Sequence, residues 1–121
     1  KGFIPVIAPI GVSRENNYLN INADVVAGEV AEALDAEKLI LLTDVKGIGD
    51  SKNKLISKIS MQKGQRLLKA EYIKGGMTPK LMAALNAKKR GVKTCHIIDG
   101  RVPHAVLLEV LTEEGVGTMI S

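Results

Sequence analysis

The chain has 121 residues, 45% of them hydrophobic and 25% charged, which is the length and composition of one soluble globular domain with a sizeable core. An aromatic content of 2% and a formal net charge of +4 offer little to nucleic acid, so small anionic ligands fit the chain better. Because there is one cysteine and no apolar stretch of membrane-spanning length, we expect no disulfide framework, no membrane partner and a cytoplasmic setting.

Apolar and turn-rich segments alternate along the chain. They predict, in chain order, a strand at 3–10, a turn at 11–17, a helix at 23–34, a strand at 39–42, a loop or hairpin at 44–54, a helix at 60–72, a helix at 79–90, a strand at 93–98, a helix at 103–112 and a strand near 117–120. This alternation indicates an α/β fold with a mostly parallel sheet layered with helices. Ligands bind such sheets where strand carboxyl ends meet helix N-termini.

Some of these segments carry finer expectations about packing. Pro5 and Pro9 place the first strand near a sheet edge, and the continuous apolar run at 39–42 is typical of a strand covered on both faces. Ser60 should cap the helix that follows it. The helix at 23–34 should turn one apolar face inward, made of Val26, Val30, Ala33 and Leu34.

The segment 72–80 reads as a phosphate cradle at the start of a helix. Gly75 and Gly76 let backbone N–H groups approach an anion, and Thr78 and Pro79 predict an N-cap and a first helical residue. The helix dipole would then favour the same anion, whereas Lys80 opposes that dipole, so stability alone does not explain it. The alternative is an ordinary glycine-rich loop before a capped helix with a solvated lysine.

Polar residues also follow or precede two other predicted elements. Asn20 and Asn22 share one face of an extended segment, and Asp24 enters the next helix; Asn22 as an N-cap and Asp24 as a first-turn acid would explain two of the three without a ligand. Thr43 and Asp44 lie at a strand's carboxyl end, where a nucleotide contact or a plain β-turn is equally consistent.

Cysteine and histidine give no sign of a metal or nucleophilic site. Cys95 lies in an apolar run and should be a small buried core residue. His96 alternates with apolar neighbours, which predicts a strand residue with a satisfied ring, whereas His104 stands near a helix start where it could contact a ligand. Two isolated histidines make a poor metal site, and neither has a convincing serine or cysteine partner.

Four segments together resemble the amino acid kinase family. They are Asn20-Ile-Asn-Ala-Asp24, Leu41-Leu-Thr-Asp-Val-Lys-Gly-Ile48, Gly75-Gly-Met-Thr-Pro-Lys80 and Glu114-Gly-Val-Gly-Thr-Met-Ile120. Within the family, the combination is most similar to the branch that phosphorylates N-acetyl-L-glutamate in arginine biosynthesis. The resemblance covers the chain in order and implies residues 1–121 are the carboxyl-terminal, nucleotide-binding domain.

The resemblance implies transfer of the ATP γ-phosphoryl group, with Mg²⁺, onto a side-chain carboxylate. Lys80 would neutralise phosphate charge, Asp24 would orient the catalytic lysines, and Asn20 with Asn22 would bind the acylated amino acid. The implied nucleotide-binding residues are Thr43, Asp44, Val45, Lys46, Gly47, Ile48, Gly49, Tyr72, Ile73, Lys74, Gly75, Gly76, Met77 and Lys80. No protein-held metal is implied.

The family's amino-terminal acyl-substrate domain has no counterpart in this chain, which begins at Lys1 rather than Met. We therefore expect a fragment of a longer kinase, inactive alone and homo-oligomeric (dimer or hexamer) at full length. Two alternatives remain open: a nucleotide-binding or regulatory module without catalysis, and a related kinase of the aminoadipate type.

The tail of the chain resembles that of arginine-inhibited members of the family. Adjacent carboxylates beside glycines can accept a guanidinium bidentately, whereas solvated acids and a glycine cap are the plain alternative. The candidate arginine-binding residues are His104, Glu113, Glu114, Gly115 and Gly117.

Overall fold

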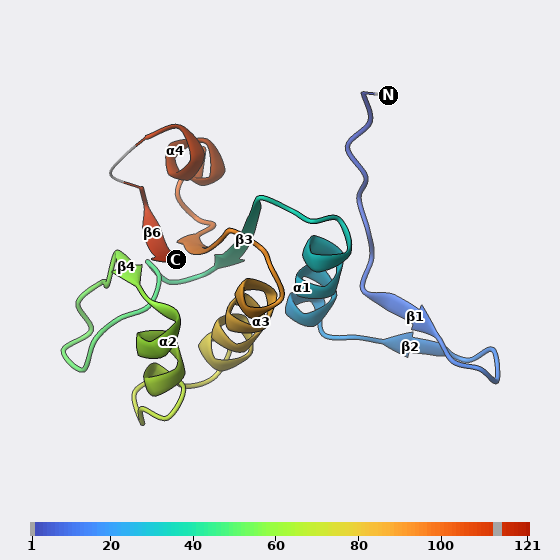
Figure 1. Cartoon of the computed structure of the whole chain (residues 1–121), viewed down its shortest axis with the longest axis horizontal. Helices are drawn as coiled ribbons and strands as arrows, with labels where there is room; N and C mark the ends of the chain where they lie inside the picture. The colour runs from blue at the N-terminus through green and yellow to red at the C-terminus, as the bar shows by residue number, and fades with distance from the viewer. Residues whose placement is uncertain (1, 113–114) are drawn as a thin grey trace.

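A computed structural model describes residues 2–112 and 115–121 of the chain. Its elements are β1 (Ile10–Val12), β2 (Tyr18–Asn20), α1 (Ala23–Ala33), β3 (Lys38–Thr43), β4 (Lys58–Ile59), α2 (Met61–Leu67), α3 (Met77–Lys89), β5 (Thr94–Asp99), α4 (Ala105–Leu111) and β6 (Gly117–Ile120). Helices and strands alternate as the sequence predicts, apart from the hairpin β1–β2 and the short strand β4. Figure 1 shows this arrangement.

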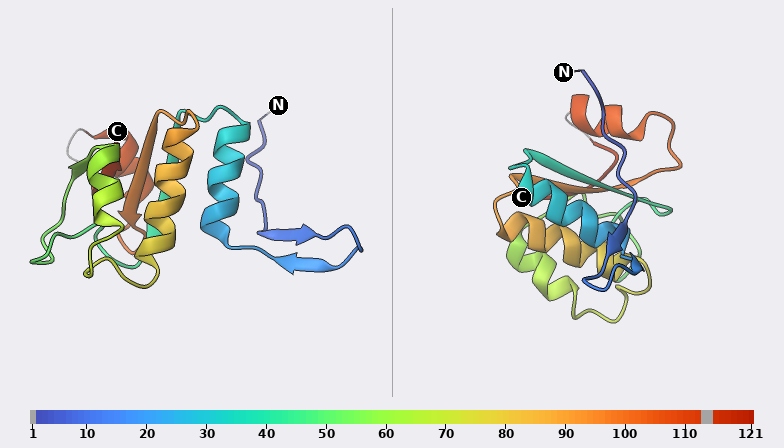
Figure 2. Two further views of the ribbon diagram at one scale, coloured as in Figure 1. Left: turned by 60° about the horizontal axis from the view of Figure 1, so that its bottom comes forward. Right: turned by 90° about the vertical axis from the view of Figure 1, so that its right-hand side faces the viewer.

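The main sheet has four strands in the order β3-β5-β6-β4. The β3–β5 and β4–β6 pairs are parallel, whereas β5 and β6 run antiparallel. Helices α1, α2 and α3 lie side by side on one face of this sheet and α4 lies on the other (Figure 2). The predicted layered α/β fold with a mostly parallel sheet is therefore confirmed.

The core lies between the sheet and the central helix α3. Leu81 and Ala84 of α3 and Ile97 of β5 have no exposed surface. Burying a large aliphatic side chain contributes roughly 1.5–3 kcal/mol of transfer free energy. Because α3 packs against both β3 and β5, its first turn is held at a fixed place relative to the sheet.

Helix α1 approaches α3 through small residues. Gly28 and Ala31 are its buried positions, and a Cβ added to Gly28 would lie 3.6 Å from the carbonyl oxygen of Ala83. The predicted inner face is wrong, because close helix packing selects small side chains rather than the largest apolar ones. The residues predicted to face inward are half-buried at Val26 and Val30 and exposed at Ala33 and Leu34.

The first predicted strand is also wrong. Residues 3–9 form no strand, and Val6 is 96% exposed. No strand of the described residues lies beside them, and Pro5 and Pro9 lack the N–H group that a sheet needs. The strand is instead Ile10–Val12, which forms with β2 a hairpin that projects from the body of the molecule (Figure 1).

Strand β3 is fully covered on one face and only partly covered on the other, where Ile40 is half-buried. Leu39 and Leu41 are buried, but Leu42 is 52% exposed. Helix α4 packs against β5 and does not bury Leu42. The apolar run at 39–42 does not by itself show how much of this face a helix covers.

Helix boundaries differ from the predicted ones by several residues. The Ser60 hydroxyl accepts a hydrogen bond from the Lys63 N–H and caps α2 as predicted, but α2 ends at Leu67 rather than near 72. Helix α3 begins at Met77, two residues before the predicted start. Within the described ranges, no helix is long and apolar enough to cross a membrane.

Candidate functional site

The carboxyl ends of β3 and β5 meet at one edge of the sheet. Thr43 stands opposite Asp99 in the parallel register, and the Gly100 N–H donates to the Thr43 carbonyl at 2.8 Å. The loops that leave these two strands, together with residues 72–77 at the start of α3, surround two adjoining cavities. Loops that follow parallel strands are the usual ligand sites of α/β sheets.

We name the two cavities by a residue that lines only one of them. The Lys80 cavity, of about 470 Å³, is lined by Leu42, Thr43, Asp44, Val45, Lys74, Gly76, Met77, Lys80 and Arg101. The Tyr72 cavity, of about 550 Å³, is lined by Asp44, Val45, Lys46, Gly47, Gly49, Asp50, Ser51, Asn53, Leu55, Tyr72, Ile73, Lys74, Met77 and Arg101. Five residues are common to both, so the cavities share a wall.

Lys80 is held by an ion pair that joins two helices. Its Nζ atom lies 2.8 Å from Asp24 Oδ1, and the two side chains are only 20% and 16% exposed. Asp24 is in the first turn of α1, where the Asn22 side-chain oxygen accepts hydrogen bonds from the Asp24 and Val25 N–H groups. The positive ends of α1 and α3 therefore converge beside Lys80, and both favour an anion there.

In the turn before α3, the backbone conformation favours glycine at only one of the two glycine positions. Gly75 has a φ of +58°, which glycine adopts without strain, whereas Gly76 has a φ of −64° and open space where a Cβ would be. No side chain caps α3. The predicted cap at Thr78 is wrong, because the helix starts earlier and the Thr78 hydroxyl donates to the Ile73 carbonyl.

Arg101 is a cavity residue that sequence reasoning did not select. Its Nε and Nη2 donate to the two carboxylate oxygens of Asp99 at 2.9 and 2.8 Å, and its backbone N–H donates to Oδ1 at 3.0 Å. These bonds from Arg101 lower the pKa of Asp99 to about 2. The only sequence signal was its place in the polar loop 99–103 after a strand.

The structure brings most of the predicted nucleotide-binding residues to the two cavities. Those that line one or both are Thr43, Asp44, Val45, Lys46, Gly47, Gly49, Tyr72, Ile73, Lys74, Gly76, Met77 and Lys80. Ile48 is placed elsewhere: its side chain is fully buried and its N–H donates to the Thr118 hydroxyl oxygen at 2.9 Å. Gly75, Asn20 and Asn22 line neither cavity, and Asn20 is exposed at the end of the hairpin.

Three of the residues predicted to bind arginine are among the described residues: His104, Gly115 and Gly117. His104 precedes α4 with a φ of 58°, and Glu113 and Glu114 are outside the described residues. A Cβ on Gly115 would lie 2.8 Å from Glu109 Oε2, and one on Gly117 would lie 2.3 Å from the Ile97 carbonyl oxygen. The left-handed φ of +61° at Gly115 and the backbone packing at Gly117 thus account for both glycines without an effector.

His96 and Cys95 are structural residues, as the sequence predicts. The His96 ring nitrogens lie 2.7 Å from Glu109 Oε1 and 3.0 Å from the Thr94 hydroxyl. Cys95 is fully buried, and this burial raises the pKa of its thiol to about 11. The described residues hold no group of three histidine, cysteine or acidic side chains that could bind a metal ion.

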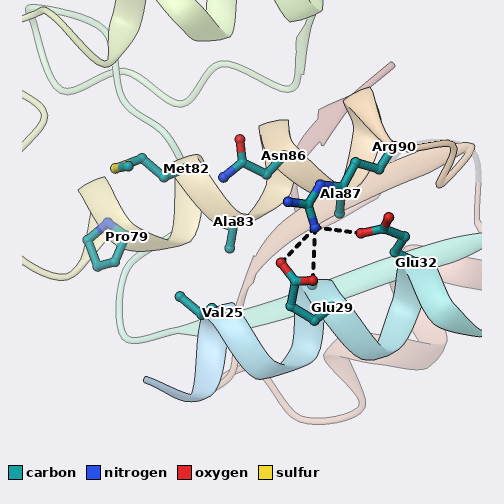
Figure 3. Close-up of a pocket in the computed structure, with 10 residues that line it drawn as sticks. Val25, Glu29, Glu32, Pro79, Met82, Ala83, Asn86, Ala87 and Arg90 are labelled. Atoms are coloured by element: carbon teal, nitrogen blue, oxygen red, sulfur yellow. Dashed lines mark hydrogen bonds and ion pairs between the residues drawn. The ribbon is translucent and has the colours of Figure 1, made fainter. Parts of the chain in front are cut away.

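A third, smaller cavity of about 130 Å³ lies between α1 and α3 (Figure 3). Arg90 Nη1 lies 2.7 Å from Glu29 Oε1 and 2.6 Å from Glu32 Oε2, so one guanidinium joins the two helices. These three side chains are 36–59% exposed, and ion pairs open to solvent contribute little to stability. The lysines that line the Lys80 and Tyr72 cavities do not line this third cavity. The candidate site is therefore the pair of adjoining cavities at the sheet edge.

Fold and cavities together define an α/β protein with basic cavities where two parallel strands end beside two helix N-termini. The sequence model of the amino acid kinase family matches residues 1–99, and the chain belongs to that family. The resemblance read from the four sequence segments is therefore confirmed.

The relatives include kinases and a synthase. Acetylglutamate kinase of Acinetobacter baumannii is 57% identical over 119 residues, which are 98% of this chain and 39% of that protein. The acetylglutamate kinase of Methanothrix thermoacetophila is 55% identical over 124 aligned positions, covering 100% of this chain and 43% of that protein. The structure of N-acetylglutamate synthase from Neisseria gonorrhoeae complexed with coenzyme A and L-arginine matches with a TM-score of 0.87 at 30% identity, over 95% of this chain and 27% of that one. The chain thus spans about two fifths of the length of the curated kinases it matches.

Proposed function

We propose that the chain is the carboxyl-terminal, nucleotide-binding part of an acetylglutamate kinase. The complete protein would transfer the γ-phosphoryl group of ATP to the side-chain carboxylate of N-acetyl-L-glutamate, giving an acyl phosphate and ADP. The observation that carries the proposal is the Lys80–Asp24 ion pair, set between two helix N-termini beside the Lys80 cavity. Identity of 55–57% to two acetylglutamate kinases supports the choice of acceptor.

The two cavities divide the nucleotide between them in this proposal. The Tyr72 cavity takes the adenine and ribose, and the Lys80 cavity takes the phosphates. Phosphoryl transfer leaves the protein little covalent work, so positioning and charge stabilisation carry it. Lys80 neutralises the transferred group, and Asp24 orients Lys80 rather than acting as a base, since a carboxylate acceptor has no proton to lose.

Mg²⁺ fits this site as a companion of the phosphates rather than as a resident of a protein cage. Asp44 is the one carboxylate that lines both cavities, and the described residues hold no larger acidic group there. Mg²⁺ commonly keeps its waters and binds one or two carboxylates together with substrate phosphates. Its chemistry is to neutralise phosphate charge, and Asp44 is the residue that would contact it.

Asn20 and Asn22 stay proposed acceptor-binding residues. The Asn22 side-chain oxygen is used by the α1 cap, which leaves its amide N–H groups for a substrate carboxylate or acetyl oxygen. Both residues lie on the exposed hairpin side of α1, where the rest of a full-length protein would complete the acceptor pocket.

The proposed activity is tested on the full-length protein that contains this chain. With MgATP, we expect ADP release and hydroxylamine-trapped acyl phosphate with N-acetyl-L-glutamate and little of either with N-acetyl-L-aspartate. The longer acceptor N-acetyl-L-2-aminoadipate is the informative comparison, because preference for it would favour the aminoadipate type. Nucleotide binding without ADP release for any of these acceptors would instead support a non-catalytic module.

We propose, further, that L-arginine inhibits the full-length enzyme through the tail after α4. A structural neighbour was solved with L-arginine, and the tail of this chain carries two adjacent carboxylates. Arginine should raise the apparent KM for N-acetyl-L-glutamate, and Glu114→Gln should relieve the effect, whereas Glu71→Gln, an exposed acid after α2, should not. Full activity of the unmutated enzyme at saturating arginine would exclude the proposal.

A further inference from the structure

We propose that Arg101 is a phosphate-binding residue of the nucleotide site, presented to the phosphate chain by Asp99. The inference rests on the proposed function and adds to it a contact from the loop after β5. Arg101 lines both the Lys80 cavity and the Tyr72 cavity, so it stands at their shared wall. A nucleotide with its base in one cavity and its terminal phosphate in the other must pass this wall with its phosphate chain.

The geometry of the Arg101–Asp99 pair leaves part of the guanidinium free for a ligand. Nε and Nη2 are used by the carboxylate, which is a bidentate arrangement along one edge of the group. A guanidinium has five N–H donors, so the Nη1 donors and one on Nη2 are not needed for this contact. The pair therefore fixes the side chain without consuming its capacity to bind an anion.

Burial is strongly unequal across the pair. The Asp99 side chain is only 7% exposed, whereas the Arg101 side chain is 65% exposed. The carboxylate is thus anchored in the fold at the end of β5, and the guanidinium extends outward from it. An arginine held in this way loses less side-chain freedom on binding phosphate than an unrestrained one would.

The charges around Arg101 favour a polyanion. The Lys80 cavity is lined by Lys74, Lys80 and Arg101 but by only one carboxylate, that of Asp44. The carboxylates of Asp24 and Asp99 pair with Lys80 and Arg101 but do not line the cavity, so the donors that face a ligand are mostly cationic. Asp44 and Lys46 are also close enough to influence the pKa of Arg101 and of Asp99, respectively. Arginine is well suited to phosphate because its planar donors match two phosphate oxygens at once.

A purely structural role is the competing explanation. Arg101 could serve only to neutralise the buried Asp99 carboxylate, which would be costly to leave unpaired. That role explains the ion pair, but it does not predict any dependence of ligand affinity on the number of phosphates. The two explanations therefore differ in a binding measurement that needs no turnover.

The test compares dissociation constants for ATP, ADP and adenosine in the full-length protein by calorimetry. We expect Arg101→Gln to raise the dissociation constants for ATP and ADP by about tenfold or more and that for adenosine by less than about twofold. Arg101→Lys should give values in between. Arg66 is an exposed arginine of α2 that lines none of the three cavities described above, so Arg66→Gln is the matched control and should change none of the three constants.

A second variant keeps the test sound if Arg101→Gln folds poorly. The double variant Asp99→Asn with Arg101→Gln removes both charges, so no buried carboxylate is left unpaired, and it should show the same phosphate-dependent loss. The role of Arg101 would be overturned if the variants bound both ATP and adenosine more weakly by the same factor, or if both variants kept their ATP affinity. Provided that the unmodified enzyme binds ATP and turns over normally, either result leaves the proposed function standing. Failure of the unmodified protein to bind ATP would overturn the proposed function as well.

Discussion

Replacing Lys80 with alanine in the full-length enzyme should lower turnover by about 10²–10³-fold, the loss typical of removing one preorganised charge or donor at a transition state. Lys80 is mostly buried, is fixed by Asp24 and lines the cavity proposed for the phosphates. A charge held in place in this way needs no reorganisation when negative charge moves during transfer. Steady-state kinetics with saturating MgATP and N-acetyl-L-glutamate measures the effect.

Lys89→Ala is the matched control, because Lys89 is exposed in the last turn of the same helix and lines neither cavity. It should leave turnover unchanged.

Asp24→Asn should lower turnover much more than nucleotide affinity, since it frees Lys80 without removing its charge. If Lys80→Ala kept near-normal turnover, Lys80 would serve only to join the two helices. If Asp24→Asn were less stable but kept full specific activity, Asp24 would serve only the start of α1.

The local chemistry of the site could be predicted from sequence, because the features concerned are short in range. Two glycines before a helix and a lysine against its dipole are visible within six residues. The ion pair that gives Lys80 its place joins residues 56 positions apart, and no single-sequence pattern encodes that distance. The family resemblance implied that Asp24 would orient lysines.

Arg101 shows why part of the site was missed. An arginine in a polar loop is most often solvated, and the sequence does not show that Asp99, two residues earlier, would turn its side chain onto the cavity wall. Ile48 shows the opposite error, since it stands among true cavity residues but alternates into the core. Both outcomes depend on side-chain direction in the loops that follow β3 and β5, which composition does not determine.

The errors in the fold have a related physical cause. A run such as 3–9 is apolar enough for a strand, but a strand exists only if another strand pairs with its backbone. Among the described residues, the run forms no such ladder, and its one backbone bond is from the Ile21 N–H to the Pro9 carbonyl. Helix α1 likewise selects its inward face by the close approach of α3, which favours Gly28 over larger apolar neighbours. Periodicity predicts that an element has an inner face, while the partner decides which face that is.

Replacing Gly117 with alanine should destabilise the fold by about 3 kcal/mol, the upper part of the usual range for overpacking. A Cβ there would lie 2.3 Å from the Ile97 carbonyl oxygen and 2.8 Å from the Ile98 Cα atom. Both are backbone atoms of the central strand β5, with which Gly117 pairs directly. Neither atom can move without disturbing the β5–β6 pairing, so the strain has no inexpensive release. Urea denaturation of the unmutated and variant proteins measures the difference.

Gly28→Ala provides the control within the same chain. A Cβ at Gly28 meets only an ordinary contact at 3.6 Å in a helix interior, so this substitution should be neutral or stabilise by about 0.5–1 kcal/mol. The two glycine variants also separate the two roles considered for Gly117, which are packing against β5 and contact with arginine. A packing role predicts a lower urea midpoint for Gly117→Ala with the arginine response intact in the protein that remains folded. Unchanged stability together with a lost arginine response would instead make Gly117 part of an effector site, because only a ligand contact would then require the glycine.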